Sequence, residues 1–402
     1  MSRKACVVGI GETAYTKRGA ATEREYVLAC RAILAALSDA GIDPAEVDGL
    51  APFADERSSP WTLASDLGLR ELRFAATTAM PGGGGACGAM LEAAMAVESG
   101  QAEVVVVYRS LCQGQFARIG RTEATGGGDS SPTVMEAGLE ADALQAFTAP
   151  FGVLGPSVMF ALPMRRHMEV YGTTSEQLGH VAVTQRAHAS RNPRAVMGPR
   201  PLTLADHQGA RLVVDPYRLF DCCLETDGAC AVVVTTAERA SDGRGRPVAV
   251  LAAAEGTDGA QLGGAAANAG ATATGYARGG AAGVARRLFG QAGVSPGDVD
   301  VAQLYDNFSG QVLLGLEDFG FCAPGESGPL AQSGALAWPD GSLPTNTAGG
   351  NLSEAYLQGL NHVIEGVRQL RGESTSQVAD AEVCLVTSSP GIPTSAILLG
   401  RA

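Results

Sequence analysis

The segment AGIDPAEVDGL, residues 40–50, follows a helical pattern, and a near copy, AGVSPGDVDVAQL, residues 292–304, follows a second helical pattern. Both copies place Gly at the helix end, Pro three residues later, and an acidic residue, Val and Asp before an apolar run. Self-similarity of this kind predicts two copies of one α/β unit, arranged as pseudo-symmetric halves.

A second pair of matching segments extends the repeat. GGGGACGAMLEAAMAVESG, residues 82–100, runs into AEVVVV, and GGNLSEAYLQGLNHVIEG, residues 349–366, precedes AEVCLV at 381–386. Each is a glycine-rich turn that opens a helix and leads to a strand. We therefore predict an N-terminal half of residues 1–240 and a C-terminal half of residues 241–402.

The strand candidates are short β-branched runs separated by alanine-rich helical stretches, which favours buried parallel strands with helical crossovers in a layered α/β fold. A long insertion, residues 110–220, interrupts the first half and is expected to cover a substrate cleft. Gly9, Gly11 and Ala14 fit a G-x-G-x-x-A dinucleotide pattern after the first strand, but the repeat explains that strand better.

Composition and sequence patterns argue against several classes of function. A net charge of -13 opposes binding to nucleic acid, and no apolar run is long enough to span a membrane. No signal peptide is visible, so a cytoplasmic location is expected. The nine cysteines lack CxxC spacing and are predicted to be reduced, and the five histidines form no metal-binding pattern.

Four segments resemble the thiolase superfamily, and within it the lipid-transfer-protein-like, sterol carrier protein-type thiolases. The resemblance covers the whole chain and is carried by MEVYGTTSEQLGHVAVTQRAHASRNP (168–193), FDCCLETDGACAVVV (220–234), QLYDNFSG (303–310) and GGNLSEAYLQGL (349–360). It implies a thiolase fold, with two βαβαβαββ halves in a five-layered α-β-α-β-α arrangement, and a homodimer.

The family's acyl-transfer groups are absent at the matching positions. Counting back from Gly100 by the family's spacing places its nucleophilic cysteine at Gly83, and Cys87 lies one helical turn further on as a small buried residue. The histidine of the Gly-His-Pro motif falls on Tyr356. The catalytic loop corresponds to Tyr305, Asp306, Asn307 and Phe308, and the C-terminal cysteine motif to residues 388–391, Ser-Ser-Pro-Gly.

The tyrosine pair is similar to that of the actinobacterial steroid side-chain-cleaving retro-aldolases. This resemblance implies a carbon–carbon lyase that cleaves a 17-hydroxy steroid carrying a CoA-thioester side chain into a 17-keto steroid and propionyl-CoA. It implies Tyr305 and Tyr356 as the catalytic residues, without assigning acid and base. It also implies a complex with the OB-fold domain of an acyl-CoA hydratase.

A retro-aldol cleavage needs a base for the hydroxyl proton, a stabilised thioester enolate and an acid. Schiff-base chemistry is disfavoured because Lys4 and Lys17, the two lysines, lie outside the matched motifs, and no metal or other cofactor is expected. Asp306 and Asn307 either orient Tyr305 or form a turn. Two alternatives stay open: a non-catalytic acyl-CoA or lipid carrier, and a conventional thiolase that uses Cys87.

Overall fold

The computed structural model describes residues 3–78, 82–115, 149–153, 155–240, 246–256, 277–388 and 394–402. The elements before the insertion, and the strand after it, are β1 (Ala5–Glu12), β2 (Thr16–Lys17), α1 (Glu25–Ala40), β3 (Gly49–Pro52), α2 (Pro60–Asp66), β4 (Phe74–Ala75), α3 (Gly85–Ser99), β5 (Val104–Cys112) and β8 (Thr226–Thr236). Among residues 3–112 and 226–236, the major elements therefore follow the predicted βαβαβαββ order.

After the short helix α9 (Ala237–Ala240) the same order begins again. Its elements are β9 (Val248–Gly256), α10 (Ala282–Ala292), β10 (Val301–Gln303), α11 (Ser309–Asp318), α12 (Ser327–Gln332), α13 (Gly350–Ser353), α14 (Leu360–Arg371), β11 (Val383–Thr387) and β12 (Thr394–Arg401). An isolated parallel bridge between Ala302 and Thr345 stands where the first half has β4. The division at residue 240 adjoins residues 241–245, outside the described ranges, and stays a prediction.

Ten strands of the described ranges form one hydrogen-bonded sheet in the order β10-β11-β12-β9-β1-β8-β5-β3-β4, with β2 attached to β8, and the two remaining strands pair separately within the insertion. The prediction of parallel strands is wrong for much of this sheet, because β8 runs antiparallel between β1 and β5, and β12 runs antiparallel between β11 and β9. The pairs β3–β5, β3–β4 and β10–β11 are parallel. In the second half β11 ends at Thr387 and β12 begins at Thr394, so the connection is too short for the helical crossover that parallel strands need, and β12 returns antiparallel.

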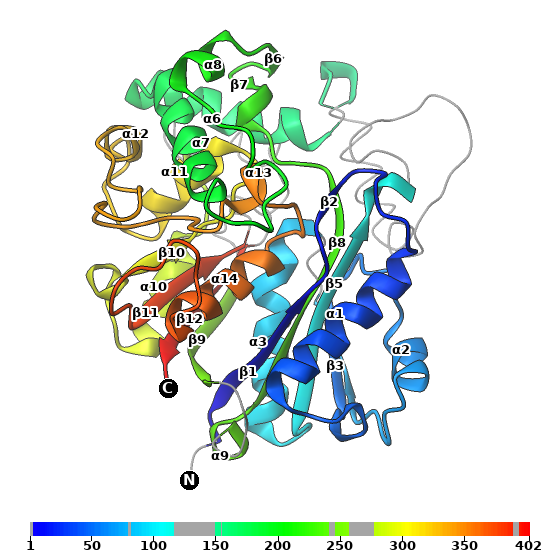
Figure 1. The fold of residues 1–402 in the computed structure, drawn as a ribbon. Coiled ribbons are helices and arrows are strands. Elements are labelled where there is room, and N and C mark those ends of the chain that lie inside the picture. Colours follow the sequence, from blue (N-terminus) through cyan, green and yellow to red (C-terminus); the bar gives the residue numbers. More distant parts are fainter. Residues whose placement is uncertain are drawn as a thin grey trace.

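Helices and strands alternate in five layers (Figure 1). Side chains of α1 pack on one face of β1, β5 and β8. Helices α3 and α14 share a core with strands of both halves and so form the central layer. Helix α10 packs on the outer face of β9, β10, β11 and β12. This α-β-α-β-α arrangement is the predicted thiolase architecture.

The repeated segments adopt the same local structure. Helices α1 and α10 both end at a glycine with φ 69°, Gly41 and Gly293, in the left-handed conformation that glycine favours. Each glycine is followed by a 3₁₀ turn with a capping box, Asp43 with Glu46 in one half and Ser295 with Asp298 in the other. The self-similarity in sequence therefore reflects one repeated supersecondary unit.

The glycines of β1 serve helix packing. A Cβ at Gly9 would lie 2.2 Å from the carbonyl oxygen of Ala36, and one at Gly11 would lie 2.3 Å from that of Ala32. Both carbonyls belong to α1, so the two glycines let this helix approach the strand closely. This close packing explains both glycines of the G-x-G-x-x-A pattern.

The insertion packs on the C-terminal half. Its described elements are α6 (Pro156–Tyr171), α7 (Ser175–Ala189), α8 (Leu204–Gly209), β6 (Leu212–Val214) and β7 (Tyr217–Arg218). Helix α7 begins at a capping box of Thr174 and Gln177 and shares a core with α11. The segment TGGGDSSP, residues 125–132, lies outside the described residues.

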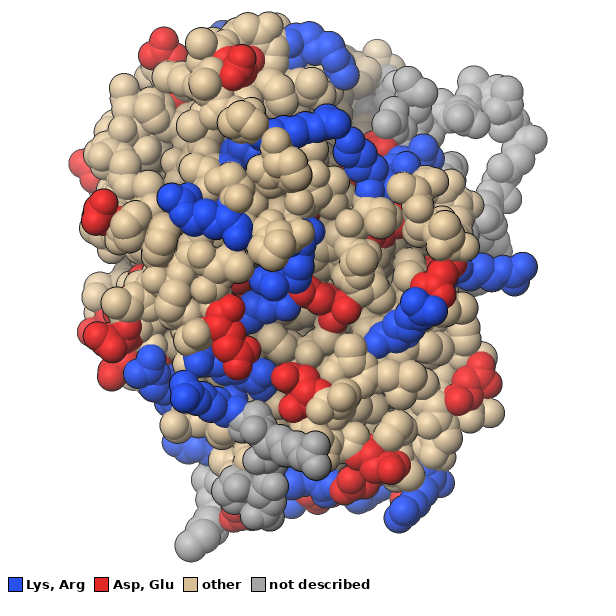
Figure 2. Space-filling model, in the orientation of Figure 1, with Lys and Arg blue, Asp and Glu red and all other residues tan. Residues whose placement is uncertain are grey.

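Acidic and basic side chains are interspersed over the face shown in Figure 2. None of the helices in the described ranges is both long and apolar enough to traverse a bilayer. All nine cysteines are free thiols. Nothing in the structure tests the cytoplasmic location, which stays a prediction.

Candidate active site

The two tyrosines singled out from the sequence meet in space. Tyr305 follows β10, and Tyr356 lies in the turn between α13 and α14. Their hydroxyl oxygens are 3.2 Å apart, within hydrogen-bond distance, although 51 residues separate them in the chain. Tyr305 is 1% exposed, whereas Tyr356 is only partly buried. The Tyr305 side chain is thus enclosed, and the Tyr356 side chain is somewhat more accessible.

Tyr305 occupies the place predicted for the nucleophile. A Cβ atom built on Gly83 would lie 2.1 Å from the Tyr305 hydroxyl oxygen and 2.2 Å from its Cζ. On the other side of the ring, a Cβ on Gly359 would lie 3.2 Å from Cδ2. The Tyr305 ring is therefore held between two glycines, in space that side chains at those positions would fill.

Burial dominates the electrostatics of the pair. It raises the pKa of Tyr305 well above its ordinary value, and the neighbouring Tyr356 raises it further. Burial also raises the pKa of Tyr356, and the nearby Cys223 thiol raises it further. The hydrogen bond with Tyr305 lowers the pKa of Tyr356, but this effect is smaller than that of burial. Both phenols consequently hold their protons near neutral pH.

The main chain fixes the two tyrosines separately. The amide of Tyr305 donates to Thr387 Oγ1 at 3.0 Å, at the end of β11. The amide of Tyr356 donates to Thr226 Oγ1 at 2.9 Å, and the same hydroxyl donates back to the Tyr356 carbonyl at 3.2 Å. Thr226 begins β8, so a strand of the first half anchors a turn of the second.

Asp306 is a buried helix-capping residue. Its carboxylate accepts the backbone N–H groups of Asn351 at 2.9 Å and Leu352 at 3.1 Å, in α13, and lies 2.9 Å from His362 Nε2. It thereby ties the Tyr305 loop to the segment that leads to Tyr356. The backbone N–H of Cys223 donates to the backbone carbonyl oxygen of Asn307 at 2.9 Å. The predicted role of Asp306 and Asn307 in orienting Tyr305 stays a prediction.

Comparison with known proteins shows the family to which the chain belongs. The family described as Thiolase C-terminal domain-like matches residues 265–399. A 17-hydroxy-3-oxo-4-pregnene-20-carboxyl-CoA lyase of Mycobacterium tuberculosis is 41% identical over 408 residues, covering 100% of both chains. The chain belongs to the thiolase superfamily. A steroid side-chain-cleaving aldolase of Thermomonospora curvata is also 41% identical, over 98% of this chain and 97% of that one.

A solved structure gives the same assignment in three dimensions. The Ltp2-ChsH2(DUF35) aldolase superposes with a TM-score of 0.89 at 40% identity, covering 99% of this chain and 98% of that one. The described residues of this thiolase-superfamily member therefore share the fold of an aldolase.

Cys87, the thiol nearest in sequence to Gly83, is inaccessible. It is fully buried in the central layer, and burial raises its pKa to about 12. Its thiol points toward the Val386 carbonyl at 3.5 Å, and its amide donates to Ser388 Oγ at 3.0 Å. Ser388 thus supports the start of α3, and residues 389–391 of the matched C-terminal motif lie outside the described residues.

Three neighbours of the tyrosines were not identified from the sequence: Arg109, Gln358 and Cys223. Arg109 is a charged residue within the buried valine-rich strand β5, a signal that could have marked it. Gln358 and Cys223 carry no comparable signal. Within the described ranges, no group of three or more His, Cys, Asp or Glu side chains could hold a metal ion. The predicted absence of a cofactor stays a prediction.

Proposed function

We propose that this protein is a carbon–carbon lyase that cleaves a β-hydroxyacyl-CoA by a retro-aldol reaction, with a 17-hydroxy steroid CoA thioester as substrate. The observation that carries the proposal is the Tyr305–Tyr356 hydroxyl pair, 3.2 Å apart, with Tyr305 in the nucleophile position. Identity of 41% over the full length to a 17-hydroxy-3-oxo-4-pregnene-20-carboxyl-CoA lyase supports this substrate class. The products would be a 17-keto steroid and propionyl-CoA.

The pair supports a proton relay between neutral phenols. The nucleophile position of a thiolase faces the acyl group of the thioester, so Tyr305 would lie near the α carbon and Tyr356 near the β-hydroxyl. As Tyr356 accepts the hydroxyl proton, its own proton moves to Tyr305, and the Tyr305 proton passes to the α carbon. The bond between the α and β carbons breaks, the β carbon becomes the ketone, and no net proton is consumed.

This assignment makes Tyr356 the base and Tyr305 the acid. It agrees with their burial, because the partly buried Tyr356 is the side chain that a bulky steroid nucleus reaches more easily. It also agrees with the raised pKa values of both phenols, since a neutral relay requires no phenolate in the free protein.

We also propose that the chain acts as a homodimer together with an OB-fold domain of an acyl-CoA hydratase. The solved aldolase at 40% identity is described with two components, Ltp2 and ChsH2(DUF35), which supports a partner of this kind. Such a contact would enclose the substrate and limit escape of a reactive intermediate.

The test is incubation of the purified protein with a 17-hydroxy steroid CoA thioester, alone and with the OB-fold partner, while both products are quantified by mass spectrometry. Equal release of propionyl-CoA and 17-keto steroid supports the lyase. Tight binding of the thioester without either product, in both preparations, would favour the carrier alternative.

A further inference from the structure

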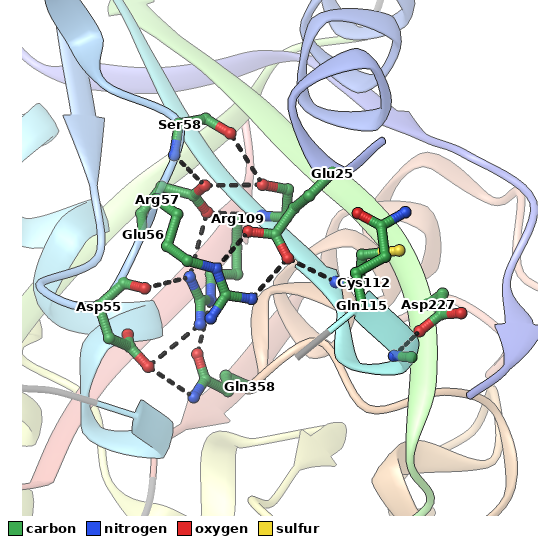
Figure 3. A network of polar contacts seen from close by, with 12 residues as sticks. Glu25, Asp55, Glu56, Arg57, Ser58, Arg109, Cys112, Gln115, Asp227 and Gln358 are labelled. Atoms are coloured by element: carbon green, nitrogen blue, oxygen red, sulfur yellow. Dashed lines mark hydrogen bonds and ion pairs between the residues drawn. The ribbon is translucent and has the colours of Figure 1, made fainter. Parts of the chain in front are cut away.

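A buried arginine of the first half reaches the loop that carries Tyr356. Arg109 is 1% exposed in β5, and its guanidinium contacts the carboxylates of Asp55 and Glu56, each at 3.1 Å. Its Nε donates to Gln358 Oε1 at 2.6 Å, across 249 residues of sequence (Figure 3). A buried charge with this many partners is rigidly held, because each contact offsets part of its desolvation cost.

Gln358 has an unusual backbone conformation. Its φ is 52°, in the left-handed region that residues with a Cβ rarely adopt. Gln358 is 3% exposed, and both polar atoms of its side-chain amide are hydrogen-bonded. Oε1 accepts from Arg109, and Nε2 donates to Asp55 Oδ2 at 3.0 Å. Strain of this kind persists where surrounding contacts determine the conformation, and it is concentrated at functional sites.

Gln358 lies in the chain between Tyr356 and the glycine that packs against the Tyr305 ring. Gln358 follows Tyr356 by two residues and precedes Gly359, which has a φ of 93° and lies against the Tyr305 ring. Thr226 holds the Tyr356 end of this turn through both backbone groups. The turn is therefore fixed at one end by β8 and at the other by the ion-pair cluster of Arg109, Asp55 and Glu56. Both anchors belong to the first half.

We propose that Arg109 and Gln358, with Asp55, are positioning residues that set the separation of the Tyr305 and Tyr356 hydroxyls. The inference rests on the proposed function in so far as that separation serves proton transfer. It adds an interaction between the halves: an ion-pair cluster of the first half determines the geometry of a tyrosine pair carried by the second. Errors near 1 Å in such geometry cost about a hundredfold in rate.

The experiment uses protein labelled with 3-fluorotyrosine. The ¹⁹F resonance of Tyr356 is assigned by its loss in Tyr356→Phe, and it reports the environment of that ring without any turnover. The test variant is Gln358→Ala, which removes a neutral amide and leaves the ion pairs of Arg109 in place. Arg109→Lys is the second variant and retains the charge while losing the hydrogen bond from Nε.

Gln369→Ala is the matched control. Gln369 is also a fully buried glutamine with several side-chain bonds, to Thr347, Ser374 and Ser376, but it contacts neither tyrosine nor their turn. It controls for the general cost of deleting a buried, hydrogen-bonded amide.

We expect the Tyr356 resonance to shift or broaden in Gln358→Ala and Arg109→Lys and to stay in place in Gln369→Ala. In the lyase assay, kcat of Gln358→Ala should fall at least about tenfold while KM stays within about twofold. An unmoved resonance in Gln358→Ala overturns the inference, as does a moved resonance with unchanged kcat. If the unmodified protein does not cleave the substrate, the proposed function fails, and the resonance alone still decides whether the cluster positions Tyr356.

Discussion

The hydroxyl of Tyr305 lies 2.1 Å from the point where a Cβ at Gly83 would stand. In this geometry a cysteine at position 83 and the Tyr305 side chain exclude each other. Loss of the thiolase nucleophile and presence of the tyrosine are thus sterically linked, which explains why position 83 is the smallest residue. The central helix α3 and its glycine-rich start are present, while the proposed reacting group, the Tyr305 hydroxyl, comes from the opposite half.

This linkage predicts strong coupling between positions 83 and 305. Gly83→Ala should destabilise the protein by about 1–3 kcal/mol, because the added methyl overlaps the phenol ring. In Tyr305→Ala the ring is absent, and Gly83→Ala should then cost little. A double-mutant cycle by chemical denaturation measures the coupling, which we expect to be at least about 1 kcal/mol. Additive effects would show that the ring moves aside freely.

Cys87→Ala should retain lyase activity. Because the thiol is fully buried and its pKa is raised to about 12, it is a packing group in the central layer. We expect kcat within about twofold of the unmodified protein and a stability loss of about 1–2 kcal/mol from the small cavity. Iodoacetamide should also leave Cys87 unlabelled in the folded protein, as seen by peptide mapping. Loss of activity in Cys87→Ala would instead favour the thiolase alternative.

Glu354 should make stability depend on pH. Burial, reinforced by the Glu12 and Glu365 carboxylates, raises its pKa from 4.5 to about 8. The folded protein then holds a proton that the unfolded chain releases above its ordinary pKa, so the free energy of unfolding falls as pH rises from about 4.5 to about 8.

Glu354→Gln removes this titration and should lessen that fall, with a gain of about 1–3 kcal/mol at pH 8.5 relative to pH 5. Urea denaturation of both proteins at the two pH values measures the difference. Parallel pH profiles for the two proteins would mean that Glu354 is ionised in the folded state.

Structure could be predicted from the sequence where it depends on residues a few positions apart. The repeated helix end, 3₁₀ turn and strand at residues 40–50 and 292–304 fold alike because the same glycine and capping residues act within a few positions of one another. The meeting of Tyr305 with Tyr356 followed from the resemblance, which supplied a spatial relationship that 51 residues of separation conceal.

The pairing of strands and side chains that lie far apart in the chain could not be predicted from the sequence. The antiparallel placement of β8 between β1 and β5 depends on the path of the chain after the insertion, which residue patterns do not encode. The bond from Arg109 to Gln358 spans 249 residues, and the left-handed conformation of a glutamine has no sequence signature. In the proposed mechanism, these are the contacts through which one half positions the tyrosine pair of the other.

The central claim is that the two phenol hydroxyls carry the cleavage. Its most direct test is the single-turnover rate of propionyl-CoA release by Tyr356→Phe and Tyr305→Phe, each with the OB-fold partner and compared with the unmodified protein. We predict that each rate falls at least about a hundredfold while the Kd for the CoA thioester stays within about twofold. Rates within about threefold of the unmodified protein for either variant would contradict a relay through both hydroxyls.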